Sequence, residues 1–248
     1  MLFALRDAVK PSADVVILNG AAMTEDAPLN EGDEVSLITR GETPSADELE
    51  ALMAARHTPG VHTKLKAATV GIAGLGGLGS AIAVALARVG IGKLIIADFD
   101  VVEPSNLNRQ QYFIDQIGLP KTEALVFNLR KINPYVQIEE HAVKLTPDNL
   151  QLFDEVDVMI EAFDRADQKA MLLQAFTSEK PDVPFIGASG MAGYASGETI
   201  GIKKMGENIY IVGDLETGAQ PGCGLMAPRV GIAASMQANL ALRLIVES

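Results

Sequence analysis

A glycine-rich segment between two short apolar runs constrains the fold of this chain more than any other feature. Residues 68–100 read ATVGIAGLGGLGSAIAVALARVGIGKLIIADFD. The pattern predicts a strand over 70–73, a glycine turn, a helix over 80–89 and a second strand over 93–97. Two parallel strands joined by a crossover helix form a βαβ unit, which places the chain in the α/β class.

Each of three glycines in the turn has its own physical role. Because they lack Cβ, Gly74 permits a tight turn, Gly76 lets a phosphate approach the backbone, and Gly79 lets the helix pack close to the sheet. The helix N-terminus directs unpaired N–H groups at the same place, which favours an anion. Asp98 follows Gly79 by nineteen residues, near the ~20-residue spacing at which an acid meets ribose hydroxyls. The unit therefore predicts nucleotide binding, without distinguishing NAD from ATP.

Composition excludes several function classes. The 248 residues carry a net charge of −12, which would repel a nucleic-acid backbone, and there is no polybasic patch for a membrane surface. Cys223 is the single cysteine, so neither an internal disulfide nor a four-cysteine zinc site can form. The first residues lack the apolar core of a signal peptide, and no apolar run approaches the ~20 residues of a membrane span. We expect a cytoplasmic protein without nucleic-acid or membrane partners.

The N-terminal residues 1–45 differ from the rest of the chain. Runs at 15–19 and 34–39 are strand-like, and turn signals lie between them. They predict a small β-hairpin that extends the main domain or covers a sheet edge. A helix is expected to follow, with Ser45 as its cap and Glu48 as the capping-box partner.

The remaining periodic segments predict a Rossmann-like, mixed but mainly parallel sheet with flanking helices. The closing helix is composed mostly of small apolar residues, so we expect it to be buried against the sheet or in a dimer interface. The expected helices cover 121–132, 148–153, 168–178 and 229–246, and the expected strands cover 136–140, 156–161, 184–188, 198–203 and 208–212.

Polar side chains follow the strands of this predicted sheet. Arg109 and Lys121 come after the second strand, and both suit a phosphate, Arg as a planar fork and Lys as a point charge. Asp164 and Asp167 come after the strand at 156–161. Ligands of open α/β sheets bind at this edge. We expect Asp164 to hold a Mg²⁺ ion that arrives with a nucleotide. Asp167 reaches the same edge, where it could instead cap the next helix.

Six segments in this order resemble the ThiF/MoeB adenylyltransferases, the bacterial relatives of ubiquitin-activating enzymes. The resemblance covers about residues 45–248 and implies ATP instead of NAD. The segments are GLGGLGS at 74–80, ADFDVVEPSNLNRQ at 97–110, GLPKTEAL at 118–125, KINPYV at 131–136, EAFDRADQK at 161–169 and GLMAPRVGIAASMQANLALRLI at 224–245.

The resemblance implies an activity and roles for particular residues. Such enzymes adenylate the C-terminal glycine carboxylate of a small β-grasp sulfur-carrier protein ending in Gly-Gly and release pyrophosphate. By resemblance, Asp164 would position Mg²⁺, and Arg56 would reach the ATP of the other subunit of a homodimer. Catalysis would rest on Arg109, Lys121, Asp164 and Arg56, and ATP would bind at Gly74, Gly76, Gly77, Gly79, Asp98 (on the ribose), Asp100, Asn106, Arg109 and Lys121.

The chain also departs from many relatives. It lacks paired CxxC motifs, so no structural zinc is expected, and it lacks a cysteine soon after Pro184. Cys223 is interpreted as structural or incidental, and the enzyme is then expected to stop at the acyl-adenylate. Residues 1–43 are similar to the later part of a ThiS-type β-grasp carrier without its free Gly-Gly end. We therefore expect a ThiS-like extension on a 44–248 adenylyltransferase domain of the short ThiF type, which serves thiamine thiazole formation.

Three alternatives stay open. A tRNA threonylcarbamoyladenosine dehydratase uses the same kind of ATP site, although the net charge of −12 argues against a tRNA partner. An NAD-dependent oxidoreductase would explain the glycines and Asp98 but not Arg109, Lys121 and Asp164. An inactive scaffold would bind the carrier and ATP without turnover.

Overall fold

The N-terminal unit is a small antiparallel sheet with one helix. The structure, a computed structural model, describes residues 1–54, 57–58 and 60–248, and divides the chain into units 1–49 and 50–248. The predicted pairing of the two N-terminal strands is confirmed, and two elements that we did not predict complete the unit. In order, the elements are α1 (Leu2–Val9), β1 (Val15–Leu18), β2 (Ala21–Met23) and β3 (Val35–Ile38), with strand order β2-β1-β3.

The N-terminal sheet is separate from the main sheet. Its three strands pair only with one another in the described part of the chain. Asn19 and Gly20 both have positive φ, 52° and 82°, as a tight turn between β1 and β2 requires. Leu2 and Val16 are buried, so the unit has a small apolar core of its own. The expected cap is also present in α2 (Ala46–Ala54), where Ser45 Oγ accepts the N–H of Glu48 at 3.2 Å.

The main unit contains a seven-stranded sheet, as the sequence predicts. All neighbouring strands are parallel except β9, which is antiparallel to β10 at one edge. The order is β6-β5-β4-β7-β8-β10-β9, and the strands are β4 (Thr69–Ala73), β5 (Lys93–Ala97), β6 (Gln137–His141), β7 (Val158–Glu161), β8 (Phe185–Ala188), β9 (Gly201–Lys204) and β10 (Ile209–Gly213).

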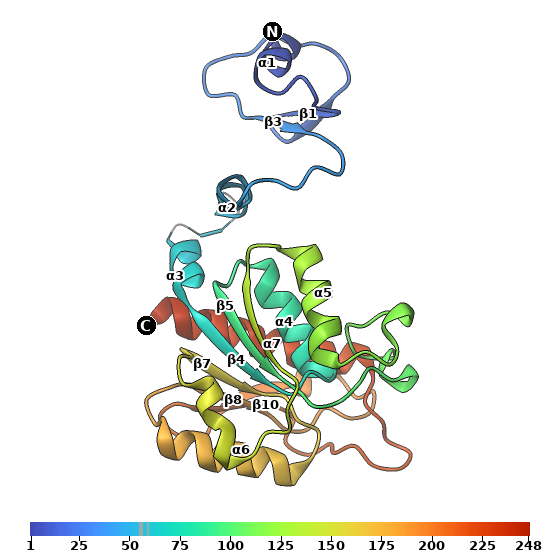
Figure 1. Cartoon of the computed structure of the whole chain (residues 1–248), viewed down its shortest axis with the longest axis vertical. Coiled ribbons are helices and arrows are strands. Elements are labelled where there is room, and N and C mark those ends of the chain that lie inside the picture. Colours follow the sequence, from blue (N-terminus) through green and yellow to red (C-terminus); the bar gives the residue numbers. More distant parts are fainter. Residues whose placement is uncertain (55–56, 59) are drawn as a thin grey trace. The chain divides into compact units, whose positions relative to one another are not determined.

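The sheet is covered on both faces (Figure 1). The apolar core of one face contains residues from four helices, and that of the other face contains residues from α6 and a 3₁₀ segment. The first set is α3 (Val61–Ala67), α4 (Gly77–Arg88), α5 (Lys121–Ile132) and α7 (Ala227–Glu247), and the second is α6 (Ala166–Glu179) and η3 (Pro147–Phe153). Short 3₁₀ turns, η1 (Pro104–Asn106) and η2 (Ile114–Gln116), lie in the loop between β5 and α5.

Helix α7 meets by length and composition the criterion for a membrane span. Its buried positions include Ala233, Ala234, Ala238 and Ala241, which belong to the same core as α4. Small side chains let two helices approach closely, so packing against α4 and the sheet accounts for its apolar composition. The predicted burial of this helix is therefore confirmed.

One predicted strand was wrong at its start. We expected a strand over 198–203, but β9 begins only at Gly201. The preceding residues form η4 (Gly197–Thr199), because Ser196 Oγ accepts the N–H of Glu198 at 3.3 Å and starts a turn.

The strand order indicates where on the sheet a ligand would bind. β5 lies on one side of β4 and β7 on the other, so the chain changes direction across the sheet at β4. Crevices at such points, outside the carboxyl ends of the strands, are where open α/β sheets bind ligands.

Candidate active site

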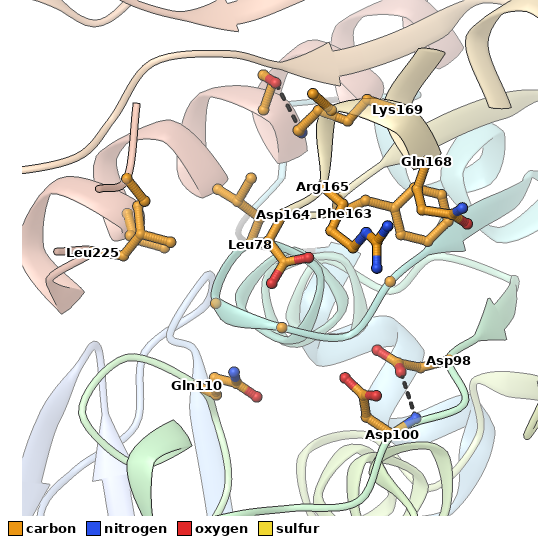
Figure 2. A pocket seen from close by; sticks show the side chains of 18 of the residues that line it. Leu78, Asp98, Asp100, Gln110, Phe163, Asp164, Arg165, Gln168, Lys169 and Leu225 are labelled. Carbon is orange, nitrogen blue, oxygen red and sulfur yellow. Dashed lines mark hydrogen bonds between the residues drawn. The ribbon is translucent and has the colours of Figure 1, made fainter. Parts of the chain in front are cut away.

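A cavity of about 350 Å³ opens at the carboxyl ends of β4, β5, β7 and β8. Figure 2 shows side chains from the loops after β5 and β7 directed into a common space beside the glycine turn. Eight residues of the predicted site line this cavity, namely Gly74, Gly76, Gly77, Asp98, Asp100, Arg109, Lys121 and Asp164.

The glycine turn is held by hydrogen bonds from both sides. Gly74 has φ +90°, a conformation that requires glycine. The N–H of Leu75 donates to Asp98 Oδ2 at 2.6 Å, and its carbonyl accepts from the hydroxyl of Tyr112 at 2.8 Å. Burial, together with Asp98 and Asp100, raises the pKa of Tyr112 well above its usual value, so this hydroxyl stays a donor.

The surroundings of Gly76 and Gly79 differ in the space that they leave for a Cβ. A Cβ on Gly79 would lie 1.9 Å from the carbonyl oxygen of Gly74, so this glycine allows the close packing of helix and turn. A Cβ on Gly76 would meet only Gln110 Nε2, at 3.9 Å, which leaves its backbone open to a ligand. Helix α4 starts at Gly77, three residues earlier than predicted. The unpaired N–H groups of its first turn therefore belong to the glycine segment itself.

Asp98 orders the turn. Its Oδ1 accepts the N–H of Asp100 at 2.8 Å (Figure 2). Its Oδ2 accepts the N–H of Leu75. Lys121 is the first residue of α5 and is buried, with its Nζ 2.8 Å from Asp100 Oδ2. This ion pair holds the ammonium group at the cavity wall.

The loop between β5 and α5 supplies an arginine and an amide. Arg109 lines the cavity, and its Nη1 donates to Asn108 Oδ1 at 2.8 Å. Gln110, which we did not assign to the site, is buried in the lining, and its Oε1 has no partner within the described residues. Asn106 is described but lies outside the lining, because its side chain accepts the N–H of Glu103 at 3.0 Å and completes the cap of η1.

The loop after β7 carries opposite charges into the cavity. Asp164 and Arg165 are exposed and line it. Asp167 does not cap α6, as we had considered, because Arg165 occupies the cap position. Instead, the Arg165 guanidinium donates to both carboxylate oxygens of Asp167, at 3.0 and 2.8 Å.

An ion pair between the buried Glu161 and the half-buried Lys169 lies next to this loop. Lys169 Nζ lies 2.9 and 3.1 Å from the two carboxylate oxygens of Glu161 and 2.9 Å from the carbonyl oxygen of Ala188. Burial raises the pKa of Glu161, and Lys169 opposes that shift. Glu161 also accepts the N–H of Phe163 at 2.6 Å, so the pair links β7, α6, β8 and the start of the loop.

The cavity is more basic than the chain as a whole. Its lining has five cationic side chains and three carboxylates, whereas the chain has a net charge of −12. Such a local reversal favours a polyanion. Arg165, Lys169 and Lys144 were not predicted, although the segment EAFDRADQK contains the first two. Arg56, predicted to act across a dimer, lies outside the described residues.

Part of the cavity wall carries no charge. It consists of Ser189–Met191 after β8 and Thr217–Ala219 after β10. Cys223 lies in a turn in which its N–H and carbonyl pair with the backbone of Gln220, and it is half-buried outside the lining.

Comparison with known proteins connects this geometry with one family. The ThiF family matches residues 50–248, and the ThiS-like ubiquitin family matches residues 1–41. Among curated proteins, ubiquitin-like modifier-activating enzyme 5 of Xenopus laevis is 46% identical over 93 residues, which cover 37% of this chain and 23% of that protein. The same enzyme of Drosophila persimilis is 38% identical over 132 residues, 48% of this chain and 34% of that protein. The matched region thus spans only about a quarter to a third of these relatives.

Solved structures share the fold. TcdA (CsdL) superposes with a TM-score of 0.72 over 79% of this chain and 93% of that chain, at 22% identity. E. coli MccB with ATP superposes with a TM-score of 0.56 over 75% of this chain and 58% of that chain, at 26% identity.

Proposed function

The chain belongs to the ThiF family, and we propose on this basis that it is an ATP-dependent adenylyltransferase for the C-terminal carboxylate of a small ubiquitin-like carrier protein. The observation that carries the proposal is one cavity in which a glycine turn, a helix N-terminus, two predicted cations and a carboxylate converge. Dehydrogenation of a substrate by NAD would leave Arg109, Lys121 and Asp164 without a use.

The residues of the cavity suit a nucleoside triphosphate. The open backbone at Gly76 and the first turn of α4 offer N–H groups to phosphate oxygens. Asp98 remains able to accept ribose hydroxyls, because each carboxylate oxygen has a second lone pair beyond the backbone bond it accepts. The unpartnered amide oxygen of Gln110 is a further polar group that a bound ligand would satisfy.

The cations fit the electrostatics of adenylation. A carboxylate oxygen of the carrier forms a bond to the α-phosphorus of ATP, and the bond to pyrophosphate breaks, so negative charge accumulates between two anions. We propose that Arg109 and Lys121 stabilise this charge. Asp164 fits a Mg²⁺ ion held mainly by phosphate oxygens, since its exposed carboxylate extends into the cavity. When bound, the ion would supply charge neutralisation.

The choice of carrier rests on the N-terminal unit and the relatives. The match of residues 1–41 to the ThiS-like ubiquitin family supports a β-grasp partner, as do relatives named for activating ubiquitin-like modifiers. We propose a sulfur carrier of the ThiS type that ends in Gly-Gly, in thiamine thiazole formation. We further propose that residues 1–43 form a ThiS-like extension of the 44–248 domain, and that the enzyme is a cytoplasmic homodimer to whose sites Arg56 contributes.

A second candidate is a tRNA threonylcarbamoyladenosine dehydratase. The observation that favours it is the superposition of E. coli TcdA, described in complexes with ATP and with AMP. The two functions predict different second substrates. A carrier tail is a peptide whose only charge is its terminal carboxylate. In contrast, tRNA is a large polyanion that a chain of net charge −12 would repel.

The decisive experiment is ATP–pyrophosphate exchange with Mg²⁺, with and without a purified β-grasp carrier ending in Gly-Gly. Exchange that requires the carrier is the expected result. Exchange or ATP hydrolysis that requires threonylcarbamoyladenosine-containing tRNA would favour the dehydratase, and bound ATP without any turnover would favour an inactive scaffold.

A further inference from the structure

A buried arginine in the first turn of α7 has no role in the proposed chemistry. The Arg229 side chain is 4% exposed. A cation at a helix N-terminus is electrostatically unfavourable, and a buried charge is costly unless it is fully partnered. Its position therefore requires compensation from other elements.

Two loops provide most of this compensation, although Arg229 Nε has no hydrogen-bond partner within the described residues. Arg229 Nη1 donates to the carbonyl oxygens of Ala195 and Ser196, at 2.7 and 2.6 Å. Its Nη2 donates to Thr199 Oγ1 at 2.9 Å and to Asp214 Oδ2 at 2.5 Å. The planar guanidinium thus joins the loop after β8 to the loop after β10.

Asp214 connects the Arg229 guanidinium to the backbone of the loop after β10. Its Oδ1 accepts the N–H groups of Glu216 and Thr217, at 2.9 and 2.8 Å, and its Oδ2 accepts the Thr217 hydroxyl at 2.6 Å. The carbonyl oxygen of Thr217 then accepts the N–H of Met191 at 3.1 Å. The two loops are therefore tied together at the level of the backbone.

The shape of these loops depends on the anchored carboxylate. Leu215 has φ +65°, an unfavourable conformation for leucine that persists only where its surroundings enforce it. Its N–H donates to the carbonyl oxygen of Ser189 at 3.0 Å. A Cβ on Gly190 would lie 2.0 Å from Asp214 Oδ1, so Gly190 and the carboxylate fit one another closely.

The tied loops form the uncharged wall of the cavity, Ser189–Met191 and Thr217–Ala219. A wall of backbone groups and uncharged, mostly small side chains suits an extended peptide with little side-chain bulk, whereas a triphosphate suits the cationic residues. We propose that Arg229 is a positioning residue that shapes this wall for the peptide tail of the carboxylate substrate and leaves nucleotide binding unaffected. The proposal rests on the proposed adenylation of a carrier protein.

The test compares the effect of a substitution on the KM for the carrier with its effect on the Kd for ATP. Arg229→Lys retains the charge beside Asp214 but loses the planar fork. We expect it to raise the KM for a purified β-grasp carrier ending in Gly-Gly about tenfold, with kcat and the Kd for ATP changed by less than about twofold. Arg229→Met should raise this KM further. Arg243→Lys is the matched control, because Arg243 lies on the same helix in an exposed pair with Glu247.

A second, milder variant tests the same inference if Arg229→Lys does not fold. Thr199→Val removes one of the contacts of Arg229 without leaving a charge unpaired, and should raise the carrier KM about threefold with the Kd for ATP unchanged. If Arg229→Lys or Thr199→Val changes carrier KM and ATP Kd equally, or changes neither, the inference is wrong. If the wild-type enzyme shows no carrier-dependent exchange, the proposed function is overturned and this inference with it.

Discussion

At the scale of single residues, three of the five cations that line the cavity are paired before any ligand binds. Lys121 is held by Asp100, Arg165 by Asp167, and Lys169 by Glu161. Arg109, in contrast, donates hydrogen bonds only to a neutral side chain and a carbonyl oxygen within the described residues. Arg109 and Lys144, which forms no ion pair within the described residues, are therefore the lining cations most directly available to a phosphate.

Replacing Arg109 tests the electrostatic role of the cavity. Arg109→Ala should lower the rate of carrier-dependent pyrophosphate exchange more than about tenfold, because at least ~1.4 kcal/mol of transition-state stabilisation is lost. Thermal unfolding should be unchanged, since the side chain is not buried. Arg130→Ala, an exposed position on α5, is the control. Full exchange activity in Arg109→Ala would remove this residue from the mechanism.

Asp164 is expected to act through magnesium. Asp164→Asn should lower the exchange rate, and added Mg²⁺ should restore part of it, because phosphate oxygens would still hold the ion more weakly. The measurement is the exchange rate over a Mg²⁺ titration. Asp167→Asn, three residues along the same segment, is the control. An unchanged Mg²⁺ dependence in Asp164→Asn would argue against a metal role.

At the scale of elements, the first turn of α4 tolerates no Cβ at Gly79. Gly79→Ala would place Cβ 1.9 Å from the carbonyl oxygen of Gly74, and we expect a loss of unfolding free energy of about 3 kcal/mol. The control is Gly231→Ala in α7, where a Cβ would meet no atom within 4 Å. This change should stabilise the protein by about 0.5–1 kcal/mol, because alanine favours helix. Chemical denaturation of both variants measures the difference.

The loop after β10 should respond to acid through Asp214. Burial works to raise the pKa of this carboxyl, but hydrogen bonds from Thr217, Glu216 and Arg229 hold it well below its usual value. A carboxyl whose pKa is lower in the folded state than in the unfolded state stabilises the fold at pH values above its unfolded pKa of about 3.9. This stabilisation is lost as the pH falls from there through the folded pKa. Asp214→Asn should therefore be less stable by about 3 kcal/mol at neutral pH.

The difference in stability between wild type and Asp214→Asn should shrink as the pH falls below about 4. Denaturant unfolding at several pH values measures it, with the exposed Asp182→Asn as control. A difference that stays constant down to pH ~2 would show that the charge of Asp214 does not contribute in this way.

At the scale of the whole molecule, the two units have separate sheets and cores. The residues of both main core clusters all follow residue 60. The positive cavity in an acidic chain is likewise a property of the main unit alone, because its lining begins at Gly74.

Deleting residues 1–43 tests the independence of the main unit. We expect the shortened chain to fold, with a melting temperature within a few degrees of wild type, because no core residue of the main unit is removed. Circular dichroism against temperature measures folding of the shortened chain. ATP binding and carrier-dependent exchange measure whether residues 1–43 contribute to function. Unchanged dimerisation and exchange would leave it without a role in either, whereas loss of folding would contradict the separation of the cores.

The amino-acid sequence by itself determined the elements whose signals are local. The glycine turn, the βαβ unit and helix α5 at 121–132 follow from apolar periodicity and backbone freedom, and these act over a few residues. The family resemblance likewise indicated residues that line the cavity. Local signals misled where side chains competed for the backbone, as at Asp167 and at the start of β9.

Only the tertiary structure decided which distant residues meet. Glu161 with Lys169, Asp98 with the N–H of Leu75, and Arg229 with Asp214 join segments whose pairing depends on strand order and packing. No periodicity encodes such pairs, since a buried charge is stable only where a partner from another element reaches it. For that reason the sequence predicted the sheet and much of the cavity lining, but not the buried ion pairs that shape its walls.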